Sequence, residues 1–179
     1  MNMELIEKHR DIENDLKERL RSEYGFAMDE LRWSGFYSQG DGASFTGAVW
    51  EFDTLVNKRQ ELLDVAPVLC KMILADKTDL SFTLIRCNYS YSHENTVMVE
   101  FNYYRTYSGD VMQDLILKAL YDHIEATELD QFEKTVLELF KDEMRKVYRE
   151  LEAEYDYLTS DEVVWDTIVA NELHKEEEA

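Results

Sequence analysis

The chain has 179 residues and a formal net charge of −20, from 39 acidic and 19 basic residues. Nucleic-acid binding depends on Lys and Arg neutralising phosphates, so a chain this acidic, with no basic patch in its sequence, is not expected to bind DNA or RNA directly. Because 45% of the residues are hydrophobic and 12% are aromatic, the composition excludes a disordered acidic tail and predicts a folded domain.

The first hundred residues begin with a predicted helix and a predicted β-hairpin. Apolar residues recur at helical spacing over residues 3–22, among charges that would face solvent. Aromatic and small residues replace this pattern over residues 31–39 and 44–52. The turn signal Gly40-Asp41-Gly42 lies between the two stretches, so they are predicted to pair as strands, with positive φ at both glycines.

A second helix and a second hairpin follow. Thr54 is predicted to cap a helix that runs to residue 76, with Pro67 starting or kinking its last part. Residues 80–91 and 97–107 are rich in Val, Ile, Thr, Phe and Tyr, which is typical of strands. By the two-residue alternation of a strand, one set of side chains in the second stretch faces the core: Val97, Val99, Phe101 and Tyr103.

The remainder is predicted to be helical, over residues 111–126, 128–158 and 161–173. This order of elements predicts an α+β fold in which the two hairpins join into one four-stranded antiparallel sheet with helices packed on one face. The whole chain, residues 1–179, is expected to form a single domain. Residues 1–109 would supply the helix, hairpin, helix, hairpin part, and residues 110–179 an acidic helical part.

The helix predicted over residues 128–158 carries an apolar stripe with spacings of mostly three and four. The stripe either packs on the rest of the domain or forms a helical seam in a homodimer, where Glu143 would weaken it. Charge is concentrated in this part of the chain, since residues 110–179 hold 21 acidic and 7 basic residues. Four outward carboxylates are the predicted partner-binding residues, placed to imitate the phosphates of DNA: Glu138, Asp142, Glu150 and Glu154.

No segment indicates a metal, a cofactor or a membrane span. Cys70 and Cys87 have no Cys-x-x-Cys spacing and are predicted to be reduced core residues. The four histidines are scattered, and neither a nucleophile elbow nor a phosphate-binding loop is found. The first ten residues lack the apolar run of a signal peptide, and no stretch approaches the ~20 apolar residues of a membrane helix, so a soluble, intracellular protein is expected.

The most distinctive stretch reads WSGFYSQGDGASFTG, over residues 33–47. It resembles a segment of the form S-G-F-x-S-Q-G-D-G-A-S-F-x-G that recurs in small uncharacterised proteins of tailed bacteriophages and prophages. The resemblance covers under a tenth of the chain. It implies an accessory protein made from a phage genome in the cytoplasm of a bacterial host, and it implies no activity.

The same stretch contains polar residues at the end of the first hairpin. Gly35 and Gly47 allow a bulge or a close backbone approach. Ser38, Gln39, Asp41 and Ser44 either satisfy turn amides or contact a ligand or partner. A tyrosine-rich patch on the second hairpin, which includes Tyr89 and Tyr91, is a further candidate binding surface.

Charge and architecture together predict a binding protein and not an enzyme. The expected partner is a host protein with a basic, nucleic-acid-binding surface, which the acidic protein would inhibit or modulate as an anti-defence or host-takeover factor. DNA mimicry is one mechanism by which it could do so. The alternative is a small phage enzyme with a site built on the hairpin from Gly35 to Gly47. A pocket that collects Asp41, Gln39 and Tyr37 would favour this alternative.

Overall fold

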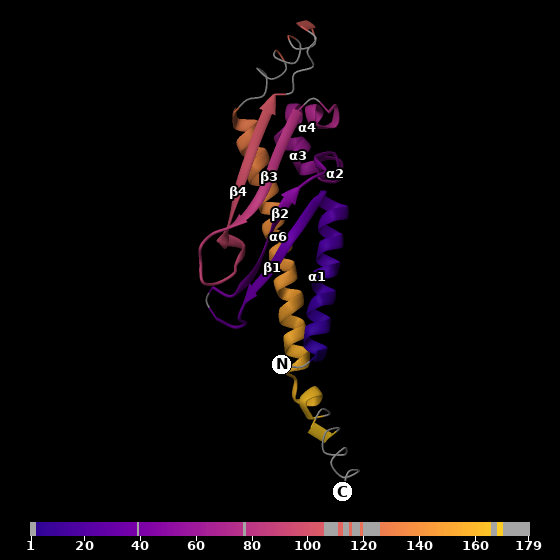
Figure 1. The fold of residues 1–179 in the computed structure, drawn as a ribbon, viewed down its shortest axis with the longest axis vertical. Coiled ribbons are helices and arrows are strands. Elements are labelled where there is room, and N and C mark those ends of the chain that lie inside the picture. Colours follow the sequence, from indigo (N-terminus) through magenta and orange to yellow (C-terminus); the bar gives the residue numbers. More distant parts are fainter. Residues whose placement is uncertain are drawn as a thin grey trace.

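The computed structural model describes residues 3–38, 40–76, 78–105, 111–112, 115, 119, 126–165 and 168–169. Four strands form one antiparallel sheet in the order β1-β2-β3-β4 (Figure 1). They are β1 (Phe26–Ser34), β2 (Gly42–Val49), β3 (Thr78–Arg86) and β4 (Val97–Arg105). The predicted α+β fold, with two hairpins joined in one sheet, is confirmed.

The two hairpins are joined along a short seam. β1 and β2 pair over their whole lengths, with an irregularity between Met28 and Glu30. β3 and β4 pair from Thr78 to Arg105 at one end to Arg86 with Val97 at the other. In contrast, β2 and β3 share only three paired positions, at Gly47, Ala48 and Val49 of β2. Beyond the seam the strands separate, and the segment after β3 comes to lie over the end of the first hairpin.

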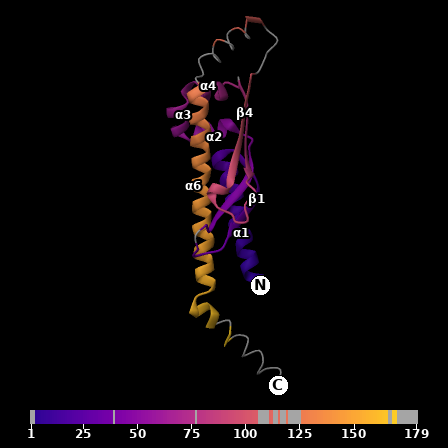
Figure 2. The same cartoon turned by 90° about the vertical axis from the view of Figure 1, so that its left-hand side faces the viewer.

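Two long helices pack against the sheet. The helix α6 (Ala126–Leu158) runs along the length of the molecule on one side of the sheet, as Figure 2 shows, and α1 (Met3–Tyr24) contacts both β1 and α6. The helices predicted over residues 3–22 and 128–158 from their apolar spacing are thus confirmed. Residues 161–165 are also helical, while most of the helix predicted over residues 111–126 and the end of that over 161–173 lie outside the described residues.

The single helix predicted between the hairpins is wrong, because the chain there forms three short helices. They are α2 (Phe52–Lys58), α3 (Gln60–Val65) and α4 (Pro67–Leu74). Arg59 and Ala66 between them have non-helical backbone angles. Pro67 is the first residue of α4, so it starts a helix, which was one of its two predicted roles. Thr54 is not a cap, since it lies inside α2 and its hydroxyl donates to Glu51 Oε2 at 3.1 Å.

The core lies between the sheet and α6. The apolar stripe of α6 is buried there, and the ring of Phe140 sits at its centre, with centroid distances of 4.5 Å to Phe26 and 5.8 Å to Phe82. The predicted inward face of β4 is confirmed, because Val97 is buried and Val99, Phe101 and Tyr103 pack against the core. The stripe therefore packs on the rest of the domain, which was the first of the two interpretations of its spacing.

Candidate functional site

The distinctive segment of residues 33–47 is built into the end of the first hairpin. Gly35 has φ +40°, and a Cβ there would lie 2.7 Å from Asp41 Oδ1. Gly47 has φ +148°, and a Cβ there would lie 2.1 Å from the carbonyl oxygen of Ala27. Both glycines thus permit close approaches that another residue would prevent. The sequence motif is largely explained by the backbone geometry of the hairpin.

One turn prediction needs correction. Gly40 has φ +90°, as predicted, but Gly42 is the first residue of β2 and does not have positive φ. Gly42 is required for a different reason, because a Cβ there would lie 2.8 Å from Cδ2 of His93. His93 precedes the short 3-10 helix η1 (Glu94–Thr96), so the segment between β3 and β4 packs directly on the hairpin.

Aromatic rings hold the loop of the first hairpin on α6. The ring of Phe36 stacks on Tyr155 and Tyr148 of α6, at centroid distances of 4.8 and 5.7 Å. Tyr37 is exposed, and its hydroxyl donates to Asp156 of the same helix. Contacts with α6 therefore fix this loop, although the two segments are more than a hundred residues apart.

The hairpin end, η1 and α6 enclose a charged cavity of about 270 Å³. Asp41, His93, Arg145 and Arg149 are among its lining residues. Arg145 joins α6 to η1, since its guanidinium lies 3.3 Å from Glu94 Oε1 of η1 and 2.5 Å from Asp142 Oδ1 of its own helix. Arg145 and His93 are thus paired with carboxylates of the protein, which favours a structural role for these two residues, whereas Arg149 has no ion pair among the described residues.

The predicted hairpin residues have different surroundings. Asp41 Oδ2 accepts a hydrogen bond from the Ser38 backbone N–H at 2.6 Å, which is a turn-stabilising contact. Ser44 is only 4% exposed, so it is not a contact residue for a large partner. Gln39 lies outside the described residues. The cavity at the hairpin end includes Asp41 but not Tyr37.

The four predicted carboxylates of α6 do not share the same surroundings. Glu138 and Asp142 both pair with Arg145, and Glu138 also pairs with Lys141. Glu150 faces α1 and pairs with Arg19 at 3.2 Å. Glu154 is partly buried. The helix as a whole contains ten acidic and five basic residues, so much of its negative charge is compensated locally.

Glu143, which interrupts the apolar stripe, is 2% exposed and joins α6 to α1. Its Oε1 accepts hydrogen bonds from the Tyr24 hydroxyl at 2.9 Å and from Lys146 Nζ at 2.6 Å. Its Oε2 lies 3.0 Å from Arg19 Nε. Burial raises the pKa of this carboxyl, but the hydrogen bonds and the positive charges outweigh burial, so that the pKa is lowered overall. The Glu143 side chain is thus held in its ionised form at neutral pH by groups of α1 and α6.

A further group of acidic residues lies at the end of the sheet where α2, α4 and β3 meet. A cavity of about 390 Å³ there is lined by apolar side chains and by Asp53, Asp76 and Asp79. None of the three aspartates pairs with a cation within the part of the chain that the structure describes. Trp50 lines the same cavity and is 77% exposed. We refer to this region as the acidic pocket.

Sequence analysis missed the acidic pocket because its aspartates come from three different elements. Asp53 lies in α2, Asp76 follows α4 with φ +53°, and Asp79 lies in β3. The exposed Trp50 next to an acidic segment was the one local signal. Only the folded chain brings these side chains to one cavity.

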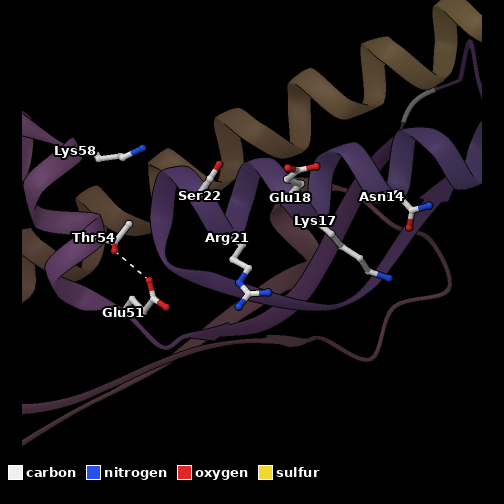
Figure 3. A pocket seen from close by; sticks show the side chains of 8 residues that line it. All are labelled: Asn14, Lys17, Glu18, Arg21, Ser22, Glu51, Thr54 and Lys58. Carbon is white, nitrogen blue, oxygen red and sulfur yellow. Dashed lines mark hydrogen bonds between the residues drawn. The ribbon is translucent and has the colours of Figure 1, made fainter.

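A larger open groove of about 700 Å³ lies between α1 and α2 (Figure 3). Its lining mixes bases and acids: Lys17, Arg21 and Lys58 with Glu18 and Glu51. Lys17 pairs with Glu13, and Lys58 with Glu23. The groove therefore has no strong preference for either sign of charge.

Among the described residues, no group of three or more His, Cys, Asp or Glu side chains is arranged to hold a metal ion. None of the described helices is long and apolar enough to cross a membrane. Cys70 and Cys87 are both unpaired thiols, but only Cys70 is buried, so the prediction of two core cysteines is correct for Cys70 alone.

Residues 5–161 match the family described as a domain of unknown function (DUF8835), and the chain belongs to this family. The match includes both hairpins and α6. The comparisons with curated proteins and with solved structures gave no match. The family description carries no activity and no link to bacteriophages.

Proposed function

We propose that this protein is a binding protein, and not an enzyme, whose partner is a protein with a basic surface. The observation that carries the proposal is the acidic pocket, where three aspartates have no ion pair with any described residue and an exposed tryptophan lines the same cavity. Carboxylates with an aromatic wall are suited to an Arg or Lys side chain, which combines an ion pair with a cation–π contact. The net charge of −20 would increase the rate of encounter with such a partner.

The origin of the partner rests on the resemblance of residues 33–47 to phage proteins. We propose that the chain is phage-encoded, acts in the host cytoplasm, and inhibits or modulates a host protein that itself binds nucleic acid. DNA mimicry is one way to do so. On this proposal the mimicking surface would be the exposed carboxylates of α6, Glu138 and Asp142 foremost, since these are 60% and 61% exposed at their side chains.

The alternative of an enzyme on the first hairpin has less support. Asp41 accepts a hydrogen bond from the Ser38 amide, and Arg145, the neighbouring cation in the cavity, is paired with Glu94 and Asp142. A catalytic acid or base needs a free position within reach of a substrate. If an enzymatic site exists on this hairpin, the cavity lined by Asp41 is where a substrate would have to bind.

The test is a pull-down from bacterial lysate over a salt series, followed by binding measurements with the captured partner. The variant D53N/D76N/D79N removes three negative charges from the acidic pocket, and Asn tolerates the positive φ of Asp76. Asp11, Asp15 and Glu18 on the exposed side of α1 supply a control, D11N/D15N/E18Q, with the same change of charge. We expect affinity to fall at least tenfold for the pocket variant and to change much less for the control.

A second variant tests mimicry. Changing Glu138, Asp142, Glu150 and Glu154 to Lys shifts the charge by +8 and should weaken the complex only if α6 is the contact surface. A complex that is insensitive to salt, or one that both sets of variants leave unchanged, would refute a basic partner. Tight binding of duplex DNA by the protein itself at physiological salt would also contradict the proposal.

A further inference from the structure

A second cavity has the opposite electrostatic character. It has a volume of about 320 Å³ and lies between the end of β1 and the segment that follows β3. Two arginines, Arg32 and Arg86, line it together with the hydroxyl residues Ser34, Ser90, Ser92 and Tyr91. None of the described acidic residues lines this cavity, although the chain contains 39 acidic residues.

The cavity is made by packing of the two unusual segments against each other. The Ser34 hydroxyl donates to the carbonyl oxygen of Ser92 at 2.8 Å and accepts from the Ser92 backbone N–H at 3.2 Å. Tyr91 contacts Tyr89, with ring centroids 5.6 Å apart. The tyrosine-rich patch and the phage-like segment, which the sequence shows as separate features, therefore form one site.

Arg86 supplies a positive charge to the lining of this cavity. It is partly buried, and among the described residues it has neither an ion pair nor a side-chain hydrogen bond. Arg32 pairs through its Nε with Glu30 Oε1 at 2.6 Å, which leaves its terminal nitrogens for another acceptor. An unpaired guanidinium that is partly withdrawn from water attracts an anion with a planar pair of donors.

Ser92 provides a second, independent indication of a ligand. The residue is only 3% exposed, yet its hydroxyl has no hydrogen-bond partner in the described part of the chain. Its oxygen is not among the polar atoms that are fully buried without a partner, so the hydroxyl is accessible from the cavity that Ser92 lines and can donate to a ligand there. Its backbone groups are occupied by Ser34, so the position of Ser92 does not depend on the hydroxyl.

We propose that this cavity binds the phosphoryl group of a small phosphorylated molecule. Guanidinium donors and hydroxyl donors from several directions suit the tetrahedral oxygens of a phosphoryl group better than the two coplanar oxygens of a carboxylate. The volume lies at the lower end of the range for small-molecule sites. The inference is independent of the proposed basic partner, because the residues involved are different and their charge has the opposite sign.

Two sources of the phosphoryl group are possible, inorganic phosphate and a mononucleotide, and titration calorimetry distinguishes them. Inorganic phosphate, AMP and acetate are titrated separately into the full chain. We expect saturable one-to-one binding of phosphate and AMP, and much weaker binding of acetate. Tighter binding of AMP than of phosphate would identify a nucleotide as the ligand, and equal binding would identify the free anion.

Three variants assign the binding to this cavity. R86Q should weaken phosphate binding about tenfold or more, and S92A about threefold to tenfold, as for loss of hydrogen bonds to a charged group. The matched control is R21Q, which removes the same charge from the groove between α1 and α2 and should leave binding unchanged. S92A keeps both backbone bonds to Ser34 and so preserves the fold, which its melting temperature would verify.

Absence of saturable binding for both phosphate and AMP would overturn the proposal. Equal binding of acetate would contradict the phosphoryl class. Wild-type affinity in both R86Q and S92A, or an equal loss in R21Q, would show that the anion does not bind in this cavity.

Discussion

The ionised Glu143 inside the helix interface makes a quantitative prediction. Its replacement by Leu removes the ion pairs with Arg19 and Lys146 and leaves the hydroxyl of Tyr24, a residue only 4% exposed, without its acceptor. Breaking a buried ion pair costs about 3–5 kcal/mol, but Arg19 and Lys146 are one-third and one-half exposed and regain water, so we expect about 2–3 kcal/mol. E143Q retains an acceptor for Tyr24 and should cost about 1–2 kcal/mol.

The pH dependence of this effect has a definite sign. The pKa of Glu143 is lowered in the fold from its ordinary value of 4.5. Its ionised form therefore stabilises the fold above pH 4.5, and the contribution is lost as the pH falls through and below that value. The difference in unfolding free energy between wild type and E143Q should be constant near pH 7 and should shrink as the solution becomes more acidic than pH 4.5.

Urea denaturation at several pH values measures this difference. The control is E138Q, since Glu138 is 60% exposed and its ion pairs should contribute under about 1 kcal/mol. If E143Q were as stable as E138Q at pH 7, or if the difference grew on acidification, the interpretation of Glu143 as a stabilising buried carboxylate would be refuted.

The other predictions concern packing and thiol chemistry. F140A removes the ring at the centre of the aromatic core and should lower the unfolding free energy by about 3–5 kcal/mol, with F140L losing less; equal urea midpoints for F140A and wild type would contradict this. G42V places a side chain against His93 and should cost about 1–3 kcal/mol, which a thermal melt coincident with wild type would disprove. Burial raises the pKa of the Cys70 thiol to about 12, so Ellman's reagent should modify Cys87 in the native protein and Cys70 only after denaturation; rapid modification of both would refute the burial of Cys70.

The long helices were predictable because their apolar spacing extends over many turns. The first strand was less so, since it begins at Phe26 and not near Leu31. Asp29 and Glu30 interrupt its apolar residues, and the irregularity after Met28 breaks the two-residue alternation on which strand prediction depends. Tertiary contacts decided the division of the second helix. Arg59 has extended backbone angles, and its Cζ lies 4.0 Å from the ring centre of Tyr24. No local sequence pattern predicts this contact between α1 and the segment after α2.

The candidate sites were predictable only where their residues are neighbours in sequence. The pairing of Asp142 with Arg145, three residues later, follows from helical spacing and was open to prediction. The pairing of Glu150 with Arg19 joins residues 131 positions apart and was not. The cavity around Arg86 could not be predicted either, because its residues are far apart in sequence. Its serines come from both hairpins and become neighbours only when the segment after β3 folds over β1.

The short seam between β2 and β3 has a consequence for folding and exchange. Within each hairpin the strands pair over eight and nine positions and are close in sequence, whereas three positions join the hairpins across α2, α3 and α4. Local pairings close small loops and form readily, while distant ones close large loops. The two ribbons should therefore behave as separate cooperative units, and their amide protons should exchange with solvent in two groups, with the boundary at Gly47–Val49.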